Sequence, residues 1–288
     1  MCDSDNNQGY IVDTSFSRRS VVLTISSVAA LAGLPTAALA ADVIETDVTV
    51  PTPDGTADAA LFHPAGSGSW PAVLMWPDIL GLRPVFRDMG RRLAAAGYTV
   101  LVPNPFYRVK RAPIVTGPFD FNNPQDQAKL NGLRDALIGA AIDRDATAFI
   151  TFLDQQKQTN RRKGAGVQGY CFSGPFAFHT AAVRSDRIRA VGTFHGGGLV
   201  TKDANSPHLL IPKTKASFVV AIARNDDQKQ PDAKDILKAT FATAKRPATV
   251  EVYAADHGWC VPGSQTYDRA SAERAWAELL RLYRANLA

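Results

Sequence analysis

The sequence contains little cysteine, with three Cys among 288 residues. It has no CxxC pair and no Cys/His cluster with the spacing of a zinc site, so we expect no bound metal. It has no internal repeat of about 20–50 residues, which excludes solenoids and propellers. No basic segment is interleaved with aromatic residues, so the net charge of +5 does not indicate a nucleic-acid partner. A content of 45% hydrophobic and 20% charged residues is typical of a globular chain.

The first forty residues resemble a bacterial twin-arginine export signal. An arginine pair at 18–19 precedes a weakly apolar run over 21–34, and residues 38–40 are Ala-Leu-Ala, the small residues that a signal peptidase requires. The run is shorter than the ~20 residues of a membrane-spanning helix. An uncleaved anchor and an accidental match are the alternatives. The interpretation predicts a signal peptide over 1–40 and a single mature domain over 41–288.

This signal has consequences for the location and the partners of the protein. Twin-arginine cargo is exported already folded, so the export machinery is an expected partner. We expect a periplasmic or secreted protein with no stable membrane association after cleavage. The compartment is oxidising, and the mature chain retains Cys171 and Cys260, so a disulfide between them is one hypothesis.

Strand-like and helix-like patterns alternate along the mature chain. Alternating polar and apolar residues over 45–50 and 58–63, around a turn with Pro and Gly, predict an antiparallel hairpin. Apolar runs predict six more strands and helical periodicity predicts four helices. The strands are expected at 71–76, 98–102, 166–170, 188–194, 218–223 and 248–253, and the helices at 86–97, 133–153, 231–246 and 265–287. This order predicts one α/β domain, with a mostly parallel sheet flanked by helices.

The most specific motif follows the strand predicted at 166–170. Ligands of parallel sheets bind beyond the carboxyl ends of the strands. There the segment Gly169-Tyr170-Cys171-Phe172-Ser173-Gly174 has small residues two positions before and after Cys171. This spacing is that of a nucleophile elbow, G-x-S-x-G in its commonest form, with Cys in place of Ser. A helix N-terminus favours a thiolate, so Cys171 is the candidate nucleophile; a buried structural Cys is the alternative.

Two later strands are followed by the partners that such a nucleophile needs. His257 comes after the strand at 248–253 and is the candidate base, while Asp226 and Asp227 come after the strand at 218–223. Asp226 is the preferred acid, and the adjacent carboxyl leaves the register open by one residue. The chain order nucleophile, acid, histidine is that of α/β-hydrolases.

Backbone and further side-chain candidates complete the predicted site. The N–H groups of Ile79 and Phe172 are expected to form the oxyanion hole. Asp78, Asp227, His195 and Trp259 are candidates for lining the site; for His195 a structural role is the stronger interpretation. The irregular segment 103–128, with four aromatic residues, is either a lid or a surface loop.

Three motifs together resemble the dienelactone hydrolase (carboxymethylenebutenolidase) family. They are the elbow at 169–174, the segment Trp76-Pro77-Asp78-Ile79-Leu80-Gly81-Leu82 and the segment Asp256-His257-Gly258-Trp259, and the resemblance covers residues 45–287. It implies an α/β-hydrolase fold that needs no cofactor. It also implies a Cys171-His257-Asp226 triad that hydrolyses an enol-lactone or related ester.

The resemblance has two departures and leaves two alternative functions. The best-known members of the family have Glu at the position of Asp78, where it controls the protonation of the thiol, and Gly at the position of Ser173. Arginines that bind a substrate carboxylate are not placed by a motif, although Arg83 and Arg108 lie near the right loops. A catalytically silent binding protein of the same fold and a carboxylesterase of different substrate range are the alternatives.

Overall fold

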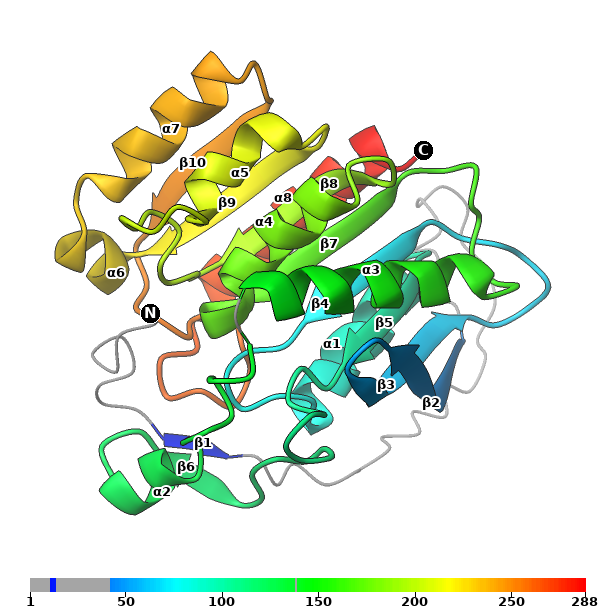
Figure 1. Ribbon diagram of the computed structural model, residues 1–288, viewed down its shortest axis with the longest axis horizontal. Coiled ribbons are helices and arrows are strands. Elements are labelled where there is room, and N and C mark those ends of the chain that lie inside the picture. The colour runs from blue at the N-terminus through cyan, green and yellow to red at the C-terminus, as the bar shows by residue number, and fades with distance from the viewer. Residues whose placement is uncertain (1–10, 14–41, 138) are drawn as a thin grey trace, which may run out of the picture.

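An eight-stranded sheet runs through the centre of the computed structural model, which describes residues 11–13, 42–137 and 139–288 (Figure 1). Its strand order is β10-β9-β8-β7-β4-β5-β3-β2. The strands are β2 (Val43–Thr52), β3 (Gly55–Pro64), β4 (Ala72–Trp76), β5 (Thr99–Pro103), β7 (Ala165–Tyr170), β8 (Ile188–Phe194), β9 (Ser217–Ala223) and β10 (Ala248–Tyr253). A separate two-stranded sheet pairs β1 (Ile11–Asp13) with β6 (Pro118–Asp120). The helices are α1 (Pro84–Ala95), α2 (Pro124–Ala128), α3 (Gly139–Gln155), α4 (Gly174–Val183), α5 (Pro207–Leu210), α6 (Arg224–Lys229), α7 (Ala233–Thr243) and α8 (Arg269–Asn286).

The predicted mostly parallel sheet is confirmed. The six strands from β10 to β5 pair in parallel, and β3 and β2 add an antiparallel hairpin at one edge. The hairpin turns between Thr52 and Gly55, and Gly55 has a φ of +136°, which only glycine adopts readily. All parallel strands therefore end at the same edge, where the predicted site residues follow them.

Alternate residues of β4 show how the sheet separates two hydrophobic layers. Leu74 and Trp76 pack into the cluster that contains α3, α4 and α7, while Val73 and Met75 pack into the cluster that contains α1 and α8. All four side chains are buried, and each such burial contributes about 1.5–3 kcal/mol. In Figure 1, α3 and α4 cover the near face and α1 and α8 lie behind the sheet. The fold is therefore a three-layer α/β structure.

The helix expected over 133–153 begins later than its sequence pattern. Gly132 has a φ of +76°, and turns occupy the segment before α3, which starts at Gly139. Leu130, Leu133 and Leu137 are nevertheless buried, so their helix-like spacing results from consecutive turns packed against the core. The last helix also starts later than expected, because Asp268 caps it by accepting a hydrogen bond from the Ser271 N–H.

The segment 103–128 is more ordered and more buried than the sequence indicates. It contains β6 and α2, and Phe106, Phe119 and Phe121 are buried. The rings of Phe119 and Phe121 pack edge to face, 4.7 Å apart, and the ring of Phe106 stacks on Phe172 of the elbow at 6.0 Å. This segment therefore forms part of the wall over the predicted site.

Apart from the short strand β1, the predicted export signal lies outside the described residues. Among the residues that are described, no helix is both long enough and apolar enough to cross a membrane.

Candidate active site

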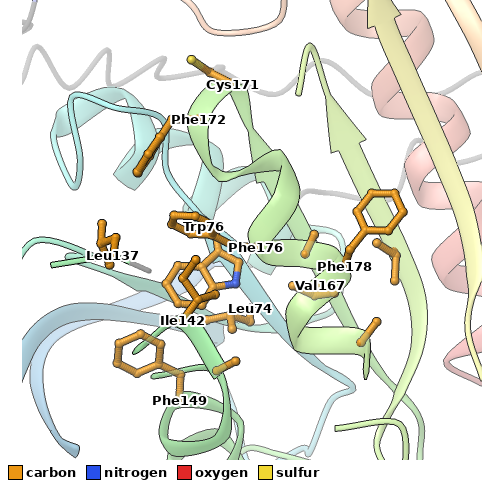
Figure 2. Packing of buried hydrophobic residues seen from close by; sticks show 14 of the residues in the cluster. Leu74, Trp76, Leu137, Ile142, Phe149, Val167, Cys171, Phe172, Phe176 and Phe178 are labelled. Atoms are coloured by element: carbon orange, nitrogen blue, oxygen red, sulfur yellow. The ribbon is translucent and has the colours of Figure 1, made fainter. Parts of the chain in front are cut away.

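Cys171 occupies a sharp turn between β7 and α4. Its φ is +55°, a left-handed conformation that is uncommon for a residue with a side chain. A Cβ atom on Gly169 would lie 2.2 Å from the Ser173 carbonyl oxygen, so the tight turn requires glycine there. Figure 2 shows Cys171 at the tip of the turn, pointing away from the packed rings of Trp76 and Phe176. The local structure thus has the geometry of a nucleophile elbow.

Ser173 holds the elbow in place through two hydrogen bonds. Its Oγ donates to the Trp76 carbonyl oxygen over 2.9 Å and accepts from the Tyr170 N–H over 3.0 Å. The residue is completely buried. Both interactions join the turn to the neighbouring strand β4 and to the end of β7. The Ser173 hydroxyl is therefore bound within the turn, and the Cys171 side chain is the one that the turn presents to the candidate site.

Of the two adjacent carboxyls, Asp226 is the one that contacts His257. The His257 Nδ1 and Asp226 Oδ2 atoms lie 2.7 Å apart. The Asp227 carboxylate instead binds the Lys234 ammonium at 2.8 Å. The Asn225 Oδ1 accepts from the His257 N–H over 2.8 Å, which fixes the loop that carries the imidazole. With Nδ1 engaged, the other ring nitrogen is the one available to a substrate or to a thiol.

Burial and charge set the protonation of His257. Burial lowers the pKa of the imidazole, but the charge and hydrogen bonding of Cys171 and the hydrogen bond to Asp226 outweigh it and raise the pKa to about 10. The imidazole therefore stays protonated at neutral pH. A cationic imidazole close to a cysteine sulfur is an arrangement that favours the thiolate form of a cysteine.

His195 lies in the wall of the site, although the sequence favours a purely structural role. It follows β8 with a φ of +41°, and its ring packs against that of His257 at a centroid distance of 4.8 Å. The Cys171 sulfur and one ring nitrogen from each histidine lie within 4.8 Å of one another. Burial and the charge of His257 lower the pKa of His195 well below its ordinary value, so this imidazole is neutral.

Trp259 lies behind the histidines. Its indole stacks on the Tyr253 ring at 4.7 Å and meets the His195 ring edge on at 6.2 Å. The side chain is completely buried. Trp259 therefore supports His195 from the core rather than presenting a polar group to a substrate.

A small, narrow cavity lies between the predicted oxyanion loop and the candidate nucleophile. Ile79 and Cys171 both line it, together with His195 and Phe121 of the segment 103–128. Phe172 follows the nucleophile in the first turn of the helix, where N–H groups have no intrahelical acceptor. The two N–H groups predicted for the oxyanion hole thus come from loops on either side of the sulfur.

Asp78 is bound by an arginine that the sequence motifs did not place in the site. Its two carboxylate oxygens accept from the Arg83 guanidinium over 2.5 and 2.8 Å, and Oδ1 also accepts from the Leu80 N–H. Both side chains are buried. The carboxylate therefore shapes the loop that carries Ile79, and Asp78 also lines the cavity beside Cys171, as predicted for a site-lining residue.

Both arginines near the predicted site are paired with carboxylates of the protein. Arg83 is paired with Asp78, and the Arg108 guanidinium binds Asp145 at 2.7 Å and Asp54 at 2.6 Å. Charged partners five to tens of residues away leave no local signal in a sequence, so these pairs are visible only in the structure.

Cys260 is separate from the candidate nucleophile. Both thiols are free in the structure, so the hypothetical disulfide is absent among the described residues. Cys260 lines an apolar cavity between α1 and α8, and burial raises the pKa of its thiol well above the ordinary value. A buried thiol of this kind is inert.

The family of the chain follows from its sequence as a whole. The family model of the dienelactone hydrolase family matches residues 57–287, which is most of the chain. The chain belongs to the dienelactone hydrolase family. A carboxymethylenebutenolidase of Rhodococcus opacus is 28% identical over 201 residues, with 69% of this chain and 74% of that protein covered. Carboxymethylenebutenolidase 1 of Cupriavidus pinatubonensis is 27% identical over 215 residues, with 74% and 86% covered.

Solved structures agree with the fold of this dienelactone hydrolase family member. A dienelactone hydrolase-like promiscuous phosphotriesterase from metagenomic libraries has a TM-score of 0.68 at 21% identity and covers 85% of this chain and 99% of that one. A dienelactone hydrolase from Anabaena variabilis has a TM-score of 0.60 at 14% identity, with the same coverage. The predicted α/β-hydrolase fold is thus confirmed, and the protein is a hydrolase of this family.

Proposed function

We propose that the protein hydrolyses lactones and esters with an enol or phenol leaving group, through an acyl-thioester on Cys171. The observation that carries this proposal is the convergence of three strand-end loops on one point. Cys171 occupies the elbow, and its sulfur lies within 4.8 Å of a His257 ring nitrogen. The other ring nitrogen of that imidazole, Nδ1, lies 2.7 Å from the Asp226 Oδ2.

In the first half of the reaction, the Cys171 thiolate attacks the carbonyl carbon and forms a carbon–sulfur bond. The carbonyl oxygen becomes an oxyanion that the N–H groups of Ile79 and Phe172 stabilise. When the tetrahedral intermediate collapses, the bond to the leaving oxygen breaks and the His257 imidazolium gives its proton to that oxygen. Asp226 keeps the imidazole in the tautomer that this transfer requires.

In the second half, the neutral His257 imidazole removes a proton from water, which attacks the thioester carbon. The acid product leaves, and the Cys171 thiolate and the imidazolium are restored. The preferred substrates follow from the collapse of the first tetrahedral intermediate. This intermediate can expel either the Cys171 thiolate, which regenerates the substrate, or the oxygen leaving group, which forms the thioester. An enol or phenol competes with the thiolate successfully, whereas an alkoxide does not. Simple alkyl esters should therefore be poor substrates.

The test compares the full-length protein with its Cys171→Ala variant on a dienelactone, an aryl acetate and an alkyl ester. We expect hydrolysis of the first two substrates and a loss of several orders of magnitude in the variant, because triad residues act as a unit. Cys260→Ala is the matched control, since it removes the other thiol of residues 41–288 and should retain hydrolysis. Hydrolysis that survives in Cys171→Ala would refute the proposed nucleophile.

Two other outcomes correspond to the alternative functions. Alkyl esters that react as fast as aryl esters would identify a carboxylesterase of different range. Stoichiometric alkylation of Cys171 with no turnover on any ester would identify a binding protein of the same fold.

We further propose that the protein is exported through the twin-arginine pathway and acts in the periplasm or outside the cell. The arginine pair at 18–19 and the Ala-Leu-Ala sequence at 38–40 support this proposal. N-terminal sequencing of the exported protein should begin at Ala41. A chain that retains residues 1–40 in the cytoplasm would refute it.

A further inference from the structure

Three residues of the active site form a cluster of metal-ligand type. The Cys171 sulfur, one nitrogen of His195 and one nitrogen of His257 lie within 4.8 Å of one another, and all three residues are buried. Thiolate and imidazole are the ligands that Zn²⁺ prefers in proteins. The three residues come from the loops after β7, β8 and β10, so no spacing in the sequence marks them as a set.

The histidine nitrogens that face this cluster have no oxygen or nitrogen partner. Both ring nitrogens of His195 are buried without a hydrogen bond, and the buried Nε2 of His257 has the Cys171 sulfur as its neighbour. His195 is only 1% exposed, and it lines the narrow cavity beside Cys171. Buried polar atoms are nearly always paired, because leaving one unpaired costs stability. These nitrogens are therefore suited to a ligand that accepts electron pairs from both imidazoles.

The surroundings resemble those of a metal site in a second respect. The His257 Nδ1 is bound by the Asp226 carboxylate, and a carboxylate behind a histidine fixes ring orientation and raises ligand basicity in zinc sites.

The distances between the ligand atoms are also close to those of a zinc site. With Zn–N and Zn–S bonds of about 2.0 and 2.3 Å, tetrahedral ligand atoms lie about 3.3–3.6 Å apart. Each of the three ligand atoms therefore needs to move inward by less than about 1 Å.

We propose that Cys171, His195 and His257 bind Zn²⁺ and that the bound metal inhibits the enzyme. Binding forms one Zn–S and two Zn–N bonds and releases to solvent the proton that His257 holds against Cys171. Water completes the coordination. The metal occupies the electron pairs of the nucleophile and of the base, so neither step of the hydrolysis can begin. Only the inhibitory part of this inference rests on the proposed function.

The test follows Co²⁺ and Zn²⁺ binding to the full-length protein after treatment with a chelator. We expect one equivalent of Co²⁺ to give a near-ultraviolet sulfur-to-cobalt charge-transfer band, which Zn²⁺ then displaces. Zn²⁺ should also slow alkylation of Cys171 and suppress ester hydrolysis, and chelator should reverse both effects. The cobalt spectrum requires no substrate, so it is informative even for a protein that hydrolyses none of the esters tested.

Three variants decide the ligand set. Cys171→Ser should lose the charge-transfer band. His195→Asn should weaken Zn²⁺ binding by about tenfold or more, and asparagine tolerates the left-handed backbone at this position. His208→Asn is the matched control, because His208 bonds Ser206 outside the cluster, and it should bind Zn²⁺ as the wild type does. A band that persists in Cys171→Ser, or equal Zn²⁺ affinity in His195→Asn and wild type, would overturn the proposal. If the wild type hydrolyses the esters but gives no cobalt charge-transfer band, the proposed zinc site is refuted and the proposed function is not.

Discussion

The pairing of His257 with Asp226 gives the sharpest prediction. Replacing Asp226 by Asn keeps the size of the side chain and removes the negative charge that faces the imidazolium. The Nδ1 and Oδ2 atoms are 2.7 Å apart, and the two side chains are 2% and 10% exposed. Water can therefore compensate little for the missing charge. The variant should lose both the protonated form of His257 and its orientation.

The size of the loss follows from the role proposed for His257. General acid–base catalysis contributes about 10²–10⁴-fold to a rate, so kcat/KM should fall by about that factor when the imidazole loses its charge partner and its orientation. The corresponding change in a Ser-His-Asp triad lowers kcat by about 10⁴-fold, which agrees with the upper limit.

The assay compares kcat/KM of Asp226→Asn and Asp227→Asn on an aryl acetate. Asp227 binds Lys234 in a half-buried pair, with side-chain exposures of 22% and 28%, so Asp227→Asn should change stability by no more than about 1 kcal/mol and retain most activity. Wild-type rates in Asp226→Asn would refute the reasoning, as would equal losses in the two variants. Equal circular dichroism spectra of both proteins exclude misfolding as the cause.

Three further predictions concern pH, the elbow and the oxyanion loop. Because His257 must be protonated to act as the general acid and its pKa is raised to about 10, kcat/KM should decline as the pH rises through about 10; an alkaline limit near pH 6.5 would contradict this. Gly169→Ala should lower the free energy of unfolding by about 3 kcal/mol or more and slow Cys171 alkylation, because its Cβ would clash with backbone. Gly132→Ala, where space is open, should cost only about 1–2 kcal/mol in the same urea titration. Arg83→Met leaves Asp78 buried without its partner and should cost about 3–5 kcal/mol; urea midpoints unchanged from wild type would contradict that pairing.

The parts of the fold that follow local rules could be predicted from the sequence. Apolar runs bounded by turn residues predict the inner strands of the central sheet within a few residues, because the strands from β5 to β9 are buried on both faces. The elbow could be predicted equally well, since glycine at 169 is a steric requirement of the turn around Cys171. Helix starts were less accurate, because the buried turns before Gly139 have the same apolar spacing as a helix.

Features that depend on contacts between loops could not be predicted. The choice between Asp226 and Asp227 depends on which carboxyl faces His257, and adjacent residues carry the same sequence signal. A lone histidine such as His195 is most often structural, and only the packing of two rings at 4.8 Å shows that it shares the cavity. The pairing of Asp78 with Arg83 likewise depends on the path of the loop between them.

The order of the strands along the chain has a consequence for biosynthesis. Cys171 follows β7 in the middle of the sheet, whereas His257 follows β10, the last strand in the chain, which pairs only with β9 at the sheet edge. A nascent chain that has folded as far as β9 therefore carries the cysteine without its imidazole. The Cys171 thiol gains its neighbour only when this edge strand docks. Under the proposed mechanism a nascent chain should therefore be inactive until that step, and the rate of Cys171 alkylation should report when it occurs.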